Sequence, residues 1–141
     1  MQLTFNGIAQ GYAADRIATL IRAEGFRDVL IDMGEIVGLG HRPTGDPWRA
    51  DIVLPNGMHV ATQALSDRAL ATSSPAGTLI GGGKPHIVNP SGQAPLWQLA
   101  SVSAPHAALA DALSTAFCLM DCPAIDRALT VFPQARLEAL V

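Results

Sequence analysis

The chain has 141 residues, of which 49% are hydrophobic and 15% are charged, and its formal net charge is −3. This length and composition exclude a disordered chain and predict a single domain with a real core over residues 1–141. The sequence has no basic cluster that would bind nucleic acid, and it has no apolar run long enough for a transmembrane segment.

The first predicted element is a helix that begins at Gly7, with Asn6 as its N-cap. Apolar residues then recur at helical spacing, and Gly25 is well placed to end the helix. Two short apolar runs bounded by turn residues follow, and they predict strands at Asp28–Asp32 and Val37–Gly40.

The middle of the chain is predicted to form a hairpin. Its strands are Trp48–Leu54 and Met58–Ala64, and they flank Pro55–Gly57, a strong turn signal. Leu70–Ser73 resembles the end of a further strand. Four glycines within Gly77–Lys84 predict a loop there.

The last third of the chain begins with an extended segment, His86–Val88. Leu99–Ala104 is predicted as a strand with two distinct faces, and Ala107–Met120 as an apolar helix. A short helix from Pro123 and a final strand and helix complete the chain. Because the helices and hairpins show no βαβ rhythm, we expect an α+β fold with a mainly antiparallel sheet and packed helices.

The two cysteines, Cys118 and Cys122, lie four residues apart at the end of a predicted helix. A disulfide is geometrically awkward at that spacing, so two free buried thiols are expected. A zinc site would need more Cys or His residues close by.

The most informative pair of side chains is Asp111 and Thr115. Residues four apart lie on one helix face, so the two side chains offer a carboxylate and a hydroxyl to one hard cation. Mg²⁺ prefers such oxygen ligands. Spacing alone favours a polar stripe on a half-buried helix, because Asp/Thr pairs four residues apart are common on helix surfaces.

Four further segments combine glycine with polar groups. Asn6–Tyr12 offers a helix N-terminus to a phosphate, and Asp32 and Glu35 place two acids at a strand end. Thr72–Pro75 is a hydroxyl cluster, and His86 supplies an imidazole. A solvated turn and a structural histidine are the simpler alternatives, but together the parts fit phosphoryl transfer.

In their order along the chain, five segments resemble the ApbE family, the FAD:protein FMN transferases. The segments are Gly7–Asp15, Asp32–Ile36, Thr72–Ser73, His86–Gly92 and Ala110–Ala116. The last matches the family's Ala-Asp-Ala-Leu-Ser-Thr-Ala without change. The resemblance implies an ApbE-like fold and the C-terminal part of such a domain. The Gly34-Glu35 pair looks like the subgroup associated with nitrous-oxide reductase maturation, the NosX-like proteins.

The resemblance implies a reaction in which the FAD pyrophosphate is split, AMP is released and FMN is joined to a threonine of a target redox protein. It implies Mg²⁺ as cofactor, held by the side chains of Asp111 and Thr115 and the carbonyl of Gly7. His86 and Asp111 would be the catalytic residues, while the general base stays open.

The resemblance also implies a set of residues that bind FAD. The residues are Thr4, Gln10, Glu35, Ser73 and Ile87. Thr4 stands where the family often has an aspartate, and Gln10 stands where it has a lysine. Gln10 therefore lacks a positive charge near the phosphates.

The sequence also departs from the family elsewhere. Asn89 replaces an aspartate, the turn at Pro90–Gly92 is one residue short, and the chain begins where the family is roughly half finished. A fragment, one subunit of a split pair and a degenerate copy are three open interpretations. The alternative function is a non-catalytic flavin- or nucleotide-binding module, or a maturation partner. Apolar surface left without the family's first half would favour a homodimer.

The localisation has two open interpretations. Family members usually work in the periplasm or at the membrane, so the resemblance implies that location. Met1–Asn6 has neither the basic n-region nor the apolar h-region of a signal peptide, which leaves a cytoplasmic location open.

Overall fold

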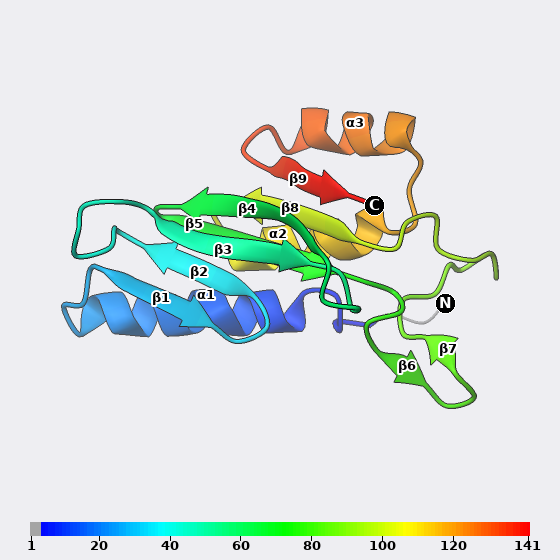
Figure 1. Cartoon of the computed structure of the whole chain (residues 1–141), viewed down its shortest axis with the longest axis horizontal. Helices are drawn as coiled ribbons and strands as arrows, with labels where there is room; N and C mark the ends of the chain where they lie inside the picture. Colours follow the sequence, from blue (N-terminus) through cyan, green and yellow to red (C-terminus); the bar gives the residue numbers. More distant parts are fainter. Residues whose placement is uncertain (1–3) are drawn as a thin grey trace.

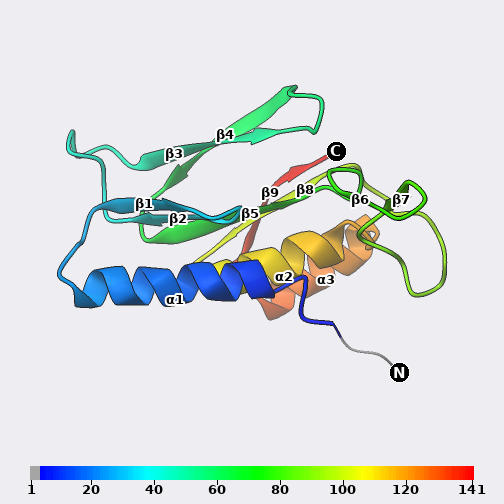
Figure 2. The same ribbon diagram turned by 90° about the horizontal axis from the view of Figure 1, so that it is seen from below.

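The computed structural model describes residues 4–141, so Met1–Leu3, on which the prediction of no signal peptide partly rests, lie outside the described residues. Its elements form three layers, with helices on one face of a central sheet and a long hairpin on the other (Figures 1 and 2). No helix among residues 4–141 is long and apolar enough to cross a membrane.

The central sheet has five strands in the order β1-β2-β5-β8-β9, and every pairing in it is antiparallel. The strands are β1 (Val29–Asp32), β2 (Ile36–Leu39), β5 (Arg68–Ser73), β8 (Ala100–Ala104) and β9 (Arg136–Leu140). The predicted α+β class with a mainly antiparallel sheet is confirmed.

The hairpin layer consists of β3 (Trp48–Val53) and β4 (His59–Leu65), joined through the predicted turn at Pro55–Gly57. Its inner face packs on the central sheet in a core with Leu70 and Leu99. The hairpin therefore leaves the main sheet after β2 and returns to it at β5.

The strand β8 is buried along its whole length because both of its faces are covered. Leu99, just before it, belongs to the core under the hairpin, whereas Ala100, Val102 and Ala104 face the helices. The predicted alternation of two faces is thus confirmed, and small side chains suit a strand packed on both sides.

The helical layer contains α1 (Ala9–Ala23), α2 (Ala107–Phe117) and α3 (Cys122–Val131). The helix α1 packs on β1 and β2, while α2 and α3 cover β5, β8 and β9. The helix α3 begins with Asp121, whose carboxylate accepts a hydrogen bond from the backbone N–H of Ala124 at 2.9 Å.

The prediction for the start of α1 is wrong, since its N-cap is Ile8 and no side chain caps it. The end of α1 is as predicted. Gly25 has φ +89°, its N–H donates to Arg22 O, and Phe26 N–H donates to Ile21 O. These two bonds form a Schellman motif, which requires the left-handed backbone that glycine adopts without strain.

Three other predictions are also corrected. The segment predicted as a loop at Gly77–Lys84 contains two short strands, β6 (Leu79–Ile80) and β7 (Lys84–Pro85), paired with each other. No helix follows β9 in the described chain. Both thiols are free as predicted, but only Cys118 is buried, because Cys122 begins α3 on the exposed side.

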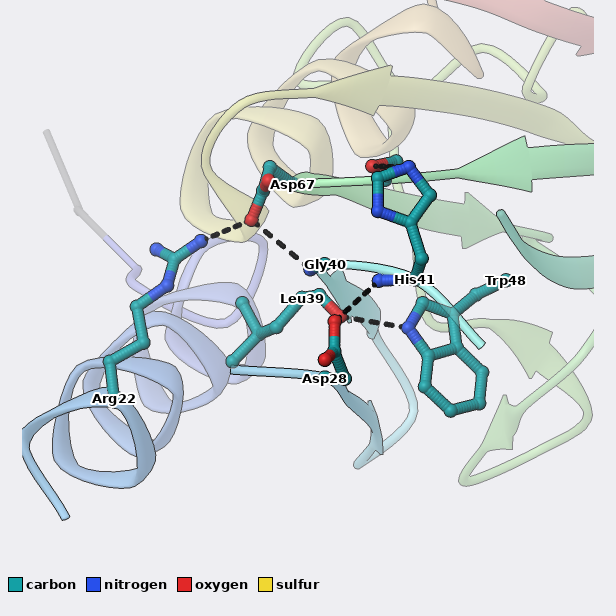
Figure 3. A network of polar contacts seen from close by, with 8 residues as sticks. Arg22, Asp28, Leu39, Gly40, His41, Trp48 and Asp67 are labelled. Atoms are coloured by element: carbon teal, nitrogen blue, oxygen red, sulfur yellow. Dashed lines mark hydrogen bonds and ion pairs between the residues drawn. The ribbon is translucent and has the colours of Figure 1, made fainter. Parts of the chain in front are cut away.

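A polar network ties α1 and the hairpin layer to the central sheet (Figure 3). Asp67, in the turn between β4 and β5, accepts hydrogen bonds from Arg22 of α1 at 2.6 Å and from Gly40 N–H at 3.2 Å. The Gly40 bond and the arginine hold the pKa of Asp67 below its ordinary value. Trp48 Nε1 donates to Leu39 O at 2.8 Å, which fixes β3 over β2.

Candidate functional site

The site is built where the N-terminal part of α1 runs antiparallel to α2 (Figure 2). A Cβ at Gly11 would lie 2.4 Å from the carbonyl oxygen of Ala107, so the two helices touch through their backbones. Gly11 lies within Asn6–Tyr12, the segment predicted to face a phosphate, but its missing side chain makes room for α2. Only glycine permits such a distance.

The contact is reinforced by hydrogen bonds in both directions. The N–H of Gly11 donates to Oδ2 of Asp111 at 2.9 Å. In return, the Asp15 carboxylate accepts from the N–H groups of Ala107 and Ala108 at 2.8 and 3.0 Å, which caps the start of α2. Gly11 and Asp15 are four residues apart on α1, and Ala107 and Asp111 are four residues apart on α2. The hydrogen bonds between them therefore fix how the two helices are aligned along their lengths.

The same register places Gly7 against Thr115. A Cβ at Gly7 would lie 3.1 to 3.3 Å from the side-chain atoms of Thr115, so bare backbone adjoins the threonine hydroxyl. Asp111, one helical turn away, is only 4% exposed. Burial raises the pKa of Asp111, and the hydrogen bond from Gly11 partly offsets this rise.

Five predicted site residues line one cavity of about 210 Å³. They are Thr4, Gly7, His86, Ile87 and Thr115, and the remaining lining residues are Asn6, Val88 and Leu119. Ile87 is buried and contributes to the core under α2, so it forms an apolar wall. The cavity thus joins the segment before α1, the loop after β7, and α2.

Ser73 is linked to this cavity through Thr115 rather than by lining it. Its Oγ lies 2.8 Å from Oγ of Ser114 and 3.2 Å from Oγ1 of Thr115. The end of β5 is therefore connected to the turn of α2 that carries Thr115. Ser114 was not predicted as a site residue, although it lies within the motif that contains Asp111.

Glu35 lies in the turn between β1 and β2, and Gln10 lies in the first turn of α1 with its side chain beside that turn; neither residue lines this cavity. Gln10 Nε2 would be 3.2 Å from a Cβ at Gly34. Glu35 is 6% exposed, and its Oε2 is the one buried side-chain oxygen or nitrogen of the described residues without a hydrogen-bond partner. Burial, together with the negative charges of Asp111 and Asp32, raises the pKa of Glu35 to about 8.

The imidazole of His86 is held in one orientation. Its Nδ1 lies 3.2 Å from Pro75 O and 3.0 Å from Thr78 O. Carbonyl oxygens only accept hydrogen bonds, so Nδ1 carries a proton. In the neutral ring, Nε2 is then the acceptor nitrogen that is available to a ligand.

The donor set suits a magnesium ion better than a zinc ion. No group of three His, Cys, Asp or Glu residues within the described 4–141 range could hold a metal. Mg²⁺ needs fewer charged ligands, because it retains water and takes one or two carboxylates together with substrate phosphates. A buried carboxylate, a hydroxyl and adjacent bare backbone fit that requirement. The buried, unpartnered Oε2 of Glu35 is a further oxygen in this region, close enough to Asp111 for the charge of Asp111 to raise the pKa of Glu35.

Comparison with known proteins places these features in a family. The family model described as the ApbE family matches residues 1–141. A FAD:protein FMN transferase of Klebsiella pneumoniae (strain 342) is 38% identical over 61 residues, which are 43% of this chain and 17% of that protein.

Two solved structures are also similar. The apo flavinyl transferase ApbE of Pseudomonas stutzeri matches 82% of this chain and 38% of its own, with 30% identity and a TM-score of 0.65. The ApbE protein of Thermotoga maritima matches 99% of this chain and 50% of its own, with 26% identity and a TM-score of 0.79. The chain thus spans half or less of these relatives.

Proposed function

The chain belongs to the ApbE family, and from this premise we propose that it takes part in transferring FMN from FAD to a threonine of an acceptor protein. In this reaction, the threonine oxygen forms a bond to the phosphorus on the FMN side of the pyrophosphate. The bond between that phosphorus and the bridging oxygen breaks, AMP leaves, and the hydroxyl proton is released.

The observation that carries the proposal is the convergence of Thr4, Gly7, His86, Ile87 and Thr115 on one cavity beside Asp111. These residues come from three segments that are distant in the sequence. Each belongs to, or directly precedes, a segment through which the chain resembles the family.

We assign the residues of the site the following roles. Asp111, Thr115 and the carbonyl of Gly7 would hold Mg²⁺, which when bound supplies neutralisation of the pyrophosphate charge. Ile87 excludes water from the cavity wall. His86 offers Nε2 to the hydroxyl proton of the acceptor, because its Nδ1 proton is directed to backbone carbonyls.

The proposal is tested by Asp111→Asn in an assay of FMN transfer from FAD to an acceptor protein, or of AMP release. Asparagine can still accept the Gly11 hydrogen bond but removes the charge. We expect activity to fall by about 100-fold or more, since even residues that only support metal ligands cost about 10- to 100-fold. The matched control is Asp126→Asn, an exposed aspartate of α3. Full activity of Asp111→Asn would refute the role of Asp111.

A second candidate function is a flavin- or nucleotide-binding module without turnover. One observation favours it: Gln10 is exposed and brings no positive charge to the phosphates. Titration of FAD with and without Mg²⁺, followed by chromatography of the products, separates the two functions. Saturable binding with intact FAD supports the module, whereas Mg²⁺-dependent AMP release supports the transferase.

A further inference from the structure

A chain of three hydroxyl groups leads from the cavity into the protein interior. Thr115 Oγ1 lies 3.2 Å from Ser73 Oγ, which lies 2.8 Å from Ser114 Oγ. Ser114 Oγ in turn lies 3.0 Å from the carbonyl oxygen of Asp111. Ser114 is fully buried, so its hydroxyl has no water with which to exchange partners.

Counting protons along this chain fixes its direction. The Asp111 carbonyl can only accept, so Ser114 donates its single proton to it. Ser114 must then accept from Ser73, which uses the proton of Ser73. With that proton committed, Ser73 can only accept from Thr115, and the proton of Thr115 points toward β5.

This direction matters for cation binding because a cation needs a lone pair and is repelled by a hydroxyl proton. Thr115 lines the cavity, and its proton points away along the hydroxyl chain. The lone pairs of Thr115 Oγ1 are therefore left for a ligand. Ser114 does not itself line the cavity, but it sets the orientation of the Thr115 hydroxyl through two hydrogen bonds.

We infer that Ser114 and Ser73 are positioning residues for the magnesium ligand Thr115. This inference rests on the proposed function, because it assumes that Thr115 binds the cation. Removing Ser114 would free the proton of Ser73 to turn toward Thr115, and the threonine lone pairs would then be occupied. Removing Ser73 would leave the Thr115 hydroxyl without its acceptor.

The central sheet contains a second pair of hydrogen-bonded hydroxyl groups, which serves as a matched control for the chain through Ser73 and Ser114. Thr72, next to Ser73 on β5, lies with its Oγ1 2.8 Å from Ser101 Oγ, and Ser101 donates to the carbonyl of Ala71 at 3.3 Å. Ser101 is also fully buried. This second hydroxyl pair has the same chemistry but no connection to Thr115 within the described chain.

The test is calorimetric titration of Mg²⁺ into the folded protein after treatment with a chelator. We expect Ser114→Ala to raise the dissociation constant by about tenfold, in the range seen for residues that support metal ligands. Ser101→Ala should stay within about twofold of the unsubstituted chain, although it loses a comparable pair of hydrogen bonds. Ser73→Ala should weaken binding, and Ser73→Thr, which keeps the hydroxyl, should restore it.

Each other outcome overturns a distinct statement. If Ser114→Ala binds Mg²⁺ normally while Asp111→Asn does not, the positioning role is wrong and the cation site stands. Equal weakening by Ser101→Ala and Ser114→Ala would mean a general loss of structure. If the unsubstituted chain takes up no Mg²⁺, both the positioning role and the proposed cation site fail.

Discussion

At the scale of single residues, the least expected feature is the carboxyl group of Glu35. The sequence places Asp32 and Glu35 at a strand end and leaves a solvated turn as an alternative, yet Glu35 is buried and one of its oxygens has no partner. Burial and tertiary charge cause its high pKa, and neither can be calculated from local sequence, because Asp111 is remote in the chain.

The raised pKa of Glu35 predicts that the stability of the folded chain depends on pH. The pKa of Glu35 is raised from 4.5 to about 8 in the folded chain. The folded state therefore binds more protons than the unfolded state between these values, and the free energy of unfolding should fall as pH rises from 4.5 to 8. Glu35→Gln should remove ~2 kcal/mol or more of this fall.

The measurement is urea unfolding at pH 5 and pH 8 in the presence of a chelator. Glu24→Gln, at the exposed end of α1, is the control and should leave the pH dependence unchanged. An identical pH dependence in Glu35→Gln and the unsubstituted chain would contradict the assignment.

At the scale of elements, the decisive feature is the register between α1 and α2. Gly7, Gly11 and Asp15 are four residues apart and meet Thr115, Asp111 and Ala107, which are also four apart. These four-residue spacings are visible in the sequence, and the one in α2 predicts that Asp111 and Thr115 lie on the same helix face. The pairing of the two helices is a tertiary property, so the capping of α2 by Asp15 was missed.

This register predicts a large effect of Gly11→Ala. The added methyl would meet the backbone of Ala107 at 2.4 Å, and backbone cannot rotate away as a side chain can. We expect a loss of about 3 kcal/mol in the free energy of unfolding, at the upper end of the range for overpacking. Thermal and urea unfolding measure it.

Gly81→Ala is the matched control, because a Cβ at Gly81 would meet nothing within 4 Å. It should leave stability within about 0.5 kcal/mol of the unsubstituted chain, as surface substitutions usually do. Similar losses in both variants would show that the helix contact does not determine the cost.

At the scale of the whole molecule, the sequence predicts most of the elements and the fold class. Turn signals such as Pro55–Gly57 and the Gly25 helix stop are local chemistry, and both are found where predicted. The start of α1 differs because a hydrogen-bonded turn precedes the helix: the N–H groups of Ile8 and Ala9 both donate to Phe5 O, and no side chain caps the helix. The hairpin layer over the sheet was not predicted, since alternating strands do not reveal which sheet they join.

The hydrogen bond between Gly11 and Asp111 joins residues that are 100 positions apart. Closing a loop of that length costs chain entropy that local turns do not. During synthesis, the partner of α1 emerges only after the hairpin and β8 have been made. The site is therefore expected to assemble late in folding, after the local hairpins. A chain in which the site has formed would then have completed the rest of its fold.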